Sequence, residues 1–365
     1  MVDFLDIKRI NNEQREALTA AFNRVMDSGW FILGNEVKQF EAAYAAFNGV
    51  KYAVGVANGL DALVLSLRSL GIGPGHEVIV PSNTYIASWL AVSQVGARPV
   101  AVEPNPATYN IDPEKIEEKI TPATRAIMPV NLYGQAAQLD TITAIAQKHN
   151  IAVLEDNAQS QGATCNGRLT GTWGIINATS FYPGKNLGAL GDAGAITTDD
   201  AALAQKITIL RNYGSQKKYY NEVPGTNSRL DEMQAAFLSV KLSVLHKNNT
   251  RRQQVAERYN ELLAGVGDLV LPALAEGCTS VFHLYVVRSN RRNALQEHLQ
   301  QKGIGTMIHY PVPPHQQQAY AELGYKKGHF PIAETIAETA ISLPIAHYLN
   351  EDQINTVVNA VKSFF

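Results

Sequence analysis

Short apolar runs alternate with helix-like segments over the first two hundred residues of the chain. The apolar runs are Tyr52–Ala57, Glu77–Val80, Arg98–Val102, Arg125–Val130, Ala152–Glu155 and Ala193–Thr197. Helical periodicity marks the segments between most of them: Leu60–Leu70, Ile86–Val95, Pro113–Ile120 and Leu139–His149. Near-continuous apolar strands separated by helices predict an α/β domain whose mainly parallel sheet is covered on both faces.

Helices are also predicted on either side of this alternating region. Amphipathic patterns predict helices at Glu13–Ser28 and Asn35–Phe47. A long helical stretch from Leu230 to about Ala264, rich in Lys, Arg and Gln, is expected to connect the large domain to a smaller one.

The remaining C-terminal part is expected to form a small α+β domain. Its predicted elements are a strand at Val281–Val287, a helix at Ala294–Lys302 and a final helix from Glu351. We therefore predict a large domain over residues 1–245 and a small C-terminal domain over residues 246–365.

The composition narrows the class of protein. Of 365 residues, 45% are hydrophobic and 18% charged, as in a globular protein, and the net charge of −2 argues against nucleic-acid binding. Only two cysteines occur, Cys165 and Cys278, far apart in sequence, which predicts neither a disulfide framework nor a metal cluster. No apolar run is long enough to span a bilayer and no signal peptide is visible, so we expect a cytoplasmic protein.

Asp156 and Gln159 follow an apolar strand, where pockets form in parallel sheets. Burying an unpaired acid is costly. Opposite a protonated pyridine nitrogen, however, Asp156 would form a charge-assisted hydrogen bond, and Gln159 could reach the phenolic oxygen of the same ring. A helix N-cap and a Mg²⁺ ligand are the alternatives that Asp156 alone leaves open.

Lys185 stands in the glycine-rich run Ser180–Gly188. A nucleophilic amine needs an enclosed site that lowers its pKa. An imine between Lys185 and pyridoxal phosphate (PLP) meets this need and also supplies a cation for Asp156, while Ser180 can donate to the phosphate. A surface lysine in a flexible glycine loop is the alternative.

Two further runs fit a cofactor site less specifically. Gly59 and Leu60 open a helix after a strand, where backbone N–H groups can hold a phosphate, although a plain turn capped by Asn58 has the same pattern. Tyr85 follows a strand end and can stack on a flat ring or pack in the core. The usual dinucleotide and triphosphate motifs are absent.

A metal site is not predicted. His309 and His315 are too far apart for a helical i, i+4 pair, and no carboxylate accompanies them.

Together these runs resemble the DegT/DnrJ/EryC1/StrS family of PLP-dependent sugar aminotransferases over nearly the whole chain. The similar runs are Ile32–Glu36, Asn58–Leu63, Val80–Tyr85, Glu155–Gln159, Ser180–Gly188 and Asn227–Glu232. The resemblance implies the aspartate aminotransferase fold (fold type I). This fold has a large domain with a mainly parallel seven-stranded sheet and a small α+β C-terminal domain. It also implies a homodimer with shared active sites.

The resemblance further implies the roles of single residues. Lys185 forms the internal aldimine with PLP and later moves protons. Asp156 faces the pyridine nitrogen, Gln159 faces the phenolic oxygen and Tyr85 stacks on the ring. The phosphate is held by Gly59, Leu60 and Ser180, with Asn227 reaching it from the other subunit.

Within the family, three runs resemble aminotransferases acting at C3 of dTDP-3-keto-6-deoxyhexoses: Ala107–Asp112, Arg211–Ser215 and His309–Gln316. L-glutamate is the expected amino donor in a ping-pong transamination. The expected substrate contacts are Arg211, Tyr213, Tyr219, His309 and Tyr310.

Two departures from the usual family pattern, at Asn131 and at Ser160–Gln161, are expected to line the sugar pocket. A 4-keto aminotransferase of the same family is the alternative function. A non-catalytic binding or regulatory relative is a further one, against which the intact set of Asp156, Gln159 and Lys185 argues.

Overall fold

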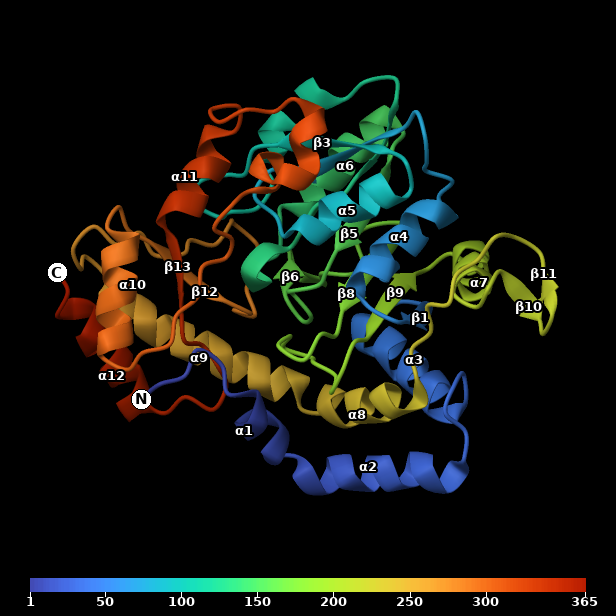
Figure 1. Cartoon of the computed structure of the whole chain (residues 1–365), viewed down its shortest axis with the longest axis horizontal. Helices are drawn as coiled ribbons and strands as arrows, with labels where there is room; N and C mark the ends of the chain where they lie inside the picture. Colours follow the sequence, from blue (N-terminus) through green and yellow to red (C-terminus); the bar gives the residue numbers. More distant parts are fainter.

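A seven-stranded sheet forms the centre of the protein in the computed structural model, which describes residues 1–365 (Figure 1). Its strands are β1 (Tyr52–Val56), β2 (Glu77–Pro81), β3 (Arg98–Val102), β4 (Thr124–Ile127), β5 (Ala152–Asp156), β8 (Ile176–Ser180) and β9 (Gly194–Thr198). Their order is β1-β9-β8-β5-β4-β2-β3. Strand β9 alone runs in the direction opposite to the other six strands. The predicted mainly parallel α/β sheet is therefore confirmed.

Strand β8 was not among the predicted strands, because Ile176 is its only large apolar residue. Its polar side chains are buried by hydrogen bonding instead. Asn177 Nδ2 donates to the carbonyl of Thr197 at 3.2 Å, and Thr179 Oγ1 donates to the carbonyl of Asn157 at 3.1 Å. Satisfied polar groups can occupy a core strand that a hydrophobic pattern does not reveal.

Helices cover both faces of the sheet. They are α4 (Gly59–Ser69), α5 (Ile86–Gln94), α6 (Leu139–His149) and α7 (Ala201–Leu210). Helices α4, α5 and α7 contribute to one apolar cluster with the sheet, and α6 contributes to another.

The predicted helix at Pro113–Ile120 is wrong. This segment forms two single 3₁₀ turns, Pro113–Lys115 and Glu117–Lys119. Only Pro113 and Ile116 are buried in it, so the segment lacks the apolar stripe that holds an α-helix against a core.

Three helices, α1 (Ile7–Asn12), α2 (Arg15–Ser28) and α3 (Asn35–Asn48), precede the sheet. The long predicted helix breaks into α8 (Glu232–Leu242) and α9 (Leu245–Leu263). Glu232 caps α3, since its carboxylate accepts from the N–H groups of Gly34 at 2.8 Å, Glu36 at 2.8 Å and Val37 at 3.0 Å. This contact joins the start of α8 to the start of α3.

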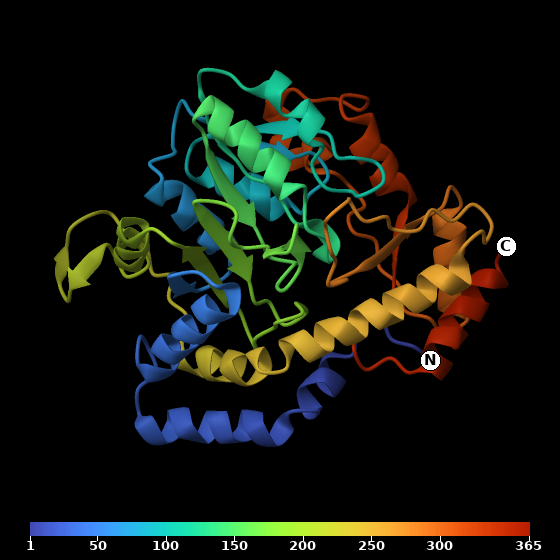
Figure 2. The ribbon, with the colours of Figure 1, turned by 180° about the vertical axis from the view of Figure 1, so that it is seen from behind.

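The C-terminal part has a two-stranded antiparallel sheet and three helices. These elements are β12 (Tyr285–Arg288), β13 (Ala340–Leu343), α10 (Arg292–Gln301), α11 (Pro331–Thr339) and α12 (Glu351–Lys362). Helix α9 crosses from beneath the large sheet to these elements (Figure 2). Leu245 packs in the cluster beside α3, whereas Val255, Tyr259 and Leu263 pack in the C-terminal core.

The division at residue 245 remains a prediction, and some contacts cross it. Val2 packs in the C-terminal core. Tyr320, from the connection after β12, packs edge to face on Trp89 of α5, with ring centroids 5.1 Å apart.

Two short hairpins complete the fold. One is formed by β6 (Thr164–Cys165) and β7 (Arg168–Leu169), and the other by β10 (Ser215–Lys217) and β11 (Tyr220–Asn221). The β10–β11 hairpin projects away from the body of the molecule in both views (Figures 1 and 2). No helix in the structure combines the length and the apolar character that crossing a bilayer requires.

Candidate active site

Asp156 ends strand β5 with its side chain buried, the residue being only 5% exposed. Ser88 Oγ donates to Oδ2 at 2.9 Å, and the N–H of Ala158 donates to Oδ1 at 3.2 Å. Burial raises the pKa of the Asp156 carboxyl, and the charge of Lys185 opposes this shift. The carboxylate forms no ion pair within the chain, so it is available to a cation that enters the site.

Lys185 lies in the loop after β8, facing the same space. The backbone N–H of Lys185 donates to the carbonyl of Tyr182 at 2.8 Å. A Cβ on Gly188 would lie 2.5 Å from the carbonyl oxygen of Pro183. The loop therefore needs glycine at 188 to turn this tightly. Burial lowers the pKa of the Lys185 amine to about 8, while Asp156 acts in the opposite direction.

Gln159 is held in one orientation. Its Oε1 accepts from the N–H of Tyr133 at 2.7 Å, which leaves Nε2 to donate to the hydroxyl of Tyr310 at 3.0 Å. The Tyr310 ring lies 5.2 Å from the ring of Tyr85, with an interplanar angle of 40°. Tyr85 is 53% exposed, so it is not core packing.

Two histidines also face the Lys185 amine. Burial and the charge of Lys185 lower the pKa of His309 to about 4 and hold that of His283 well below its usual range. His309 Nδ1 lies 2.8 Å from Ser342 Oγ, whereas Nδ1 of His283 has no hydrogen-bond partner. Both rings are therefore neutral at neutral pH and add no positive charge beside the amine.

Sequence reasoning missed His283. It stands in the run Val281–Val287, whose apolar residues predict a strand. A single histidine interrupting such a run was the available signal.

Gly59 and Ser180 meet at the start of α4. A Cβ on Gly59 would lie 2.5 Å from the Cβ of Ser180, so glycine is required for this close approach. The first N–H groups of a helix lack acceptors within the helix, and those of Gly59 and Leu60 open onto this place. Asn58 also caps the helix by accepting from the N–H of Asp61 at 2.8 Å.

The remaining predicted residues lie outside this cluster. Asn227 is exposed and forms a single β-bridge with Asn212. Tyr213 and Tyr219 belong to the loop and hairpin that project from the body, where Tyr219 is 84% exposed.

Arg211 corrects an expectation. It is 6% exposed, and its Nη1 donates to the carboxylate of Glu41 and to the carbonyl of Gly55, each at 2.5 Å. The guanidinium is thus an ion-pair partner within the fold rather than the expected substrate contact.

The two departures from the family pattern also lie behind the site. Asn131 is fully buried, donates to Glu155 at 3.1 Å and accepts from the N–H of Ala137 at 2.9 Å. Gln161 Nε2 donates to the carbonyl of Ser180 at 3.0 Å, and Ser160 is fully buried. The expectation that these residues line the sugar pocket is wrong, because their side chains are used inside the fold.

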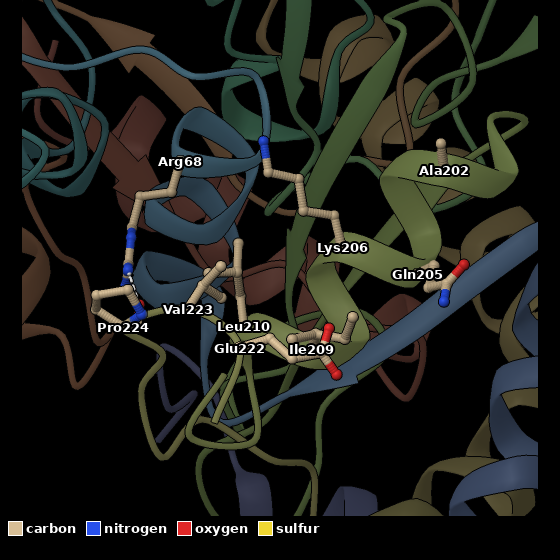
Figure 3. A pocket seen from close by; sticks show the side chains of 9 residues that line it. All are labelled: Arg68, Ala202, Gln205, Lys206, Ile209, Leu210, Glu222, Val223 and Pro224. Atoms are coloured by element: carbon tan, nitrogen blue, oxygen red, sulfur yellow. Dashed lines mark hydrogen bonds between the residues drawn. The ribbon is translucent and has the colours of Figure 1, made fainter. Parts of the chain in front are cut away.

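A surface depression under the projecting hairpin is separate from this cluster (Figure 3). Its two cations are already bound: Arg68 donates to the carbonyl of Pro224, and Lys206 donates to the carbonyl of Ser69 at 2.7 Å. None of the predicted cofactor residues lines it.

Comparison with known proteins agrees with this geometry. The model of the DegT/DnrJ/EryC1/StrS aminotransferase family matches residues 12–362. The chain is similar to a dTDP-3-amino-3,6-dideoxy-alpha-D-galactopyranose transaminase of Aneurinibacillus thermoaerophilus, with 52% identity over 364 residues, covering 100% of this chain and 99% of the relative.

Two solved structures are also similar. Streptomyces venezuelae DesV in complex with a ketimine intermediate has a TM-score of 0.98 and 49% identity, over 99% of this chain and 98% of DesV. Bacillus subtilis ntda with bound cofactor pmp has a TM-score of 0.93 and 32% identity, over 100% of this chain and 85% of ntda. The predicted aminotransferase fold is confirmed by these neighbours and by the seven-stranded sheet. The chain belongs to the DegT/DnrJ/EryC1/StrS aminotransferase family.

Proposed function

We propose that this protein is a PLP-dependent aminotransferase that moves the amino group of L-glutamate to C3 of a dTDP-3-keto-6-deoxyhexose. The observation that carries the proposal is that two unusual groups lie in one pocket. Lys185 is an enclosed amine whose pKa is lowered to about 8, and Asp156 is a buried carboxylate that forms no ion pair within the chain. The 52% identity to a dTDP-3-amino sugar transaminase supports the substrate class.

The side chains present fit PLP. Asp156 lacks the cation that a protonated pyridine nitrogen would supply. Gln159 Nε2 has a second N–H beyond the one that it gives to Tyr310, so it can donate to a phenolic oxygen. The first N–H groups of α4, at Gly59 and Leu60, have no acceptor within the helix and can hold a phosphate. Ser180 lies close to Gly59, so its hydroxyl can donate to the same phosphate. When bound, PLP supplies an electrophilic carbon for amines and a protonated ring that withdraws electrons from that carbon.

Lys185 is the group that moves the proton. With a pKa of about 8, a substantial fraction of its amine is neutral near pH 8, where it can accept the proton from the substrate α-carbon as a general base and, once protonated, serve as the general acid. The neutral rings of His283 and His309 leave the amine as the main base in the site. With PLP bound, Asp156 would face the ring nitrogen and favour its protonated form.

The sugar is proposed to lie between Lys185 and the segment that carries His309 and Tyr310. Tyr310 contacts both Gln159 and Tyr85, so it lies at the edge of the proposed PLP site. Tyr213 and Tyr219 are the other proposed contacts, and both are exposed in the segment that follows α7 and forms the β10–β11 hairpin.

We further propose a homodimer in which the projecting residues complete the partner's site. Several large apolar side chains are exposed around the start of α8 and near Lys185, namely Trp30, Phe31, Ile32, Tyr182 and Leu190. They lie together because Ile32 pairs with Asp231, and the N–H of Leu190 donates to Gln234 at 2.9 Å. An apolar surface of this kind suits a second copy of the chain, which would bring Asn227 to the phosphate. The nucleotide-sugar substrate and the two free cysteines are in keeping with the predicted cytoplasmic location.

The test is a product assay with synthetic 3-keto and 4-keto dTDP sugars, with the amino position assigned by NMR. Amination at C3 supports the proposal, whereas amination at C4 alone selects the 4-keto alternative, which shares every cofactor residue. A non-catalytic relative would give neither product, and its PLP colour would not bleach on addition of L-glutamate.

A further inference from the structure

Cys165 and Cys278, far apart in sequence, lie directly opposite each other in an antiparallel β-bridge. The N–H of Asn166 donates to the carbonyl of Gly277 at 2.7 Å, and that of Thr279 donates to the carbonyl of Thr164 at 2.8 Å. These two bonds flank the cysteines, which therefore occupy a non-hydrogen-bonded position of the ladder.

At such a position the α-carbons are about 4.5 Å apart and the side chains leave the same face of the ladder. Disulfides join α-carbons that are about 4.4–6.8 Å apart. The backbone at Cys165 and Cys278 therefore already has the spacing that a disulfide needs. The hydroxyls of Thr164 and Thr279, 3.0 Å apart, hold the same register beside the pair.

The two thiols are free and in contact. Cys165 Sγ donates to Oδ1 of Asp140 at 3.7 Å, and Cys278 Sγ donates to the carbonyl of Ala137 at 3.5 Å. The adjacent Cys278 thiol lowers the pKa of Cys165 to about 7, and the adjacent Cys165 thiol together with burial raises the pKa of Cys278. The cysteines are 1% and 7% exposed, but Asn166 and Gly277 beside them are exposed, so the pair lies just beneath the surface. A small reagent needs only a local opening of the β6–β7 hairpin to reach it.

We propose that Cys165 and Cys278 are a redox-active pair that closes to an intramolecular disulfide in the folded protein when it meets a low-molecular-weight disulfide. The Cys165 thiolate attacks one sulfur of the reagent, whose S–S bond breaks and releases one thiolate. Cys278 then loses its proton and attacks the sulfur of Cys165, which expels the second reagent thiolate. The two cysteines lose two electrons and two protons, and the reagent disulfide is reduced to two thiols.

The bond would fasten the strand that enters the active site. Beyond Cys278 the chain passes Ser280, which pairs with Gln135, and reaches Val281 and His283. The carbonyl of Val281 accepts from Asn186 Nδ2 at 3.0 Å, next to Lys185. A covalent link at Cys278 therefore ties this strand to the large sheet domain and leaves the amine and carboxylate of the site untouched.

The experiment treats the PLP-loaded full-length protein with glutathione disulfide and then blocks free thiols in denaturant. The expected result is the loss of both titratable thiols, a Cys165–Cys278 peptide in a non-reducing digest, and a Tm higher by about 5 °C, because the bond closes a loop of roughly a hundred residues. Dithiothreitol should restore the thiols and the original Tm.

The single variants Cys165→Ala and Cys278→Ala are the matched controls, and neither should gain Tm under the same treatment. Two free thiols after treatment, a stable glutathione adduct, or a disulfide between two chains would each overturn the proposal. The peptide digest of the unaltered protein decides the matter even where an alanine variant folds poorly.

Discussion

The Lys185 pocket and the projecting β10–β11 hairpin both carry residues that the sequence assigned to one active site, yet they differ in kind. In the pocket, Asp156, Gln159 and Tyr310 are fixed by hydrogen bonds within the chain. In the hairpin region, Tyr213 and Tyr219 are largely exposed. One chain therefore fixes the proposed cofactor residues by itself. The residues proposed to complete the site lie on an exposed surface, where we propose that they contact a second copy of the chain.

Replacing Lys185 tests the proposed cofactor residues most severely. Lys185→Ala should reduce transamination by more than about 10⁴-fold, because both the nucleophile and the proton carrier are lost. Lys185→Arg should be equally inactive, since a guanidinium remains protonated. Turnover of L-glutamate is the measurement, with circular dichroism to check folding.

Lys241 offers a matched control, because burial also lowers the pKa of this lysine to about 8. It donates to the carbonyl of Gly188 at 2.7 Å and does not contact Asp156. Lys241→Met should keep turnover within about tenfold of wild type while lowering Tm. Normal turnover by Lys185→Ala would overturn the proposed mechanism.

Asp156→Asn should lower kcat by about 10²–10³-fold, because an amide cannot keep the ring nitrogen protonated by charge. The Tm of the PLP-free variant should not fall, since burial raises the pKa of Asp156 and its ionised form is costly in the empty site. Ser88→Ala removes one donor to the same carboxylate and should cost less than about tenfold in kcat. Equal losses from both variants would contradict the assignment of the charge to this role.

Mixed dimers test whether the hairpin region serves the partner. Asn227→Ala alone should weaken PLP binding by about tenfold, the cost of one hydrogen bond to a charged group. Equal amounts of Lys185→Ala and Asn227→Ala chains, refolded together at a PLP concentration that loads wild-type sites but few Asn227→Ala sites, should regain about a quarter of wild-type active sites, since each heterodimer then holds one intact site. Activity no greater than the sum of the separate variants would mean that the site is not shared.

The smallest effect concerns the stability of the pocket in acid. The pKa of His309 is lowered to about 4 in the folded protein, so the unfolded chain binds more protons between about pH 6.5 and 4. The free energy of unfolding should therefore fall as the pH drops through this window. His309→Gln should remove about 2–3 kcal/mol of that fall, as measured by urea unfolding at pH 7 and pH 4.5.

His246→Gln, at an exposed position of α9, is the matched control and should leave the acid limb unchanged. If the free energy of unfolding of His309→Gln falls between pH 7 and pH 4.5 as much as that of the wild type, the pocket does not hold the His309 ring neutral.

Sequence patterns predicted the apolar strands of the large sheet and the polar residues Asp156 and Lys185 that follow two of them. Lys185 and Asp156 stand out because each is costly in its setting unless it has a function. Strand β8 was missed since hydrogen bonds, rather than apolar side chains, bury Asn177 and Thr179. A pattern along the chain does not contain such long-range partners.

The same limit explains the errors at the site. Arg211 looked like a free cation because its partner Glu41 is distant in sequence. Asn131 looked like a pocket residue because nothing near it in sequence indicates the buried Glu155 that it serves. His283 was passed over because its apolar neighbours are typical of a core strand.

The number of residues in helix α9 sets the distance between the two apolar cores that it joins. At about 1.5 Å per residue, α9 rises about 15 Å from Leu245, in the core beside α3, to Val255, the first of its residues in the C-terminal core. Removing one residue from its middle would turn everything beyond it by about 100°, carrying His309 and Tyr310 out of line with Lys185. The length of α9 therefore constrains the active site, and we expect natural variants of this chain to preserve it.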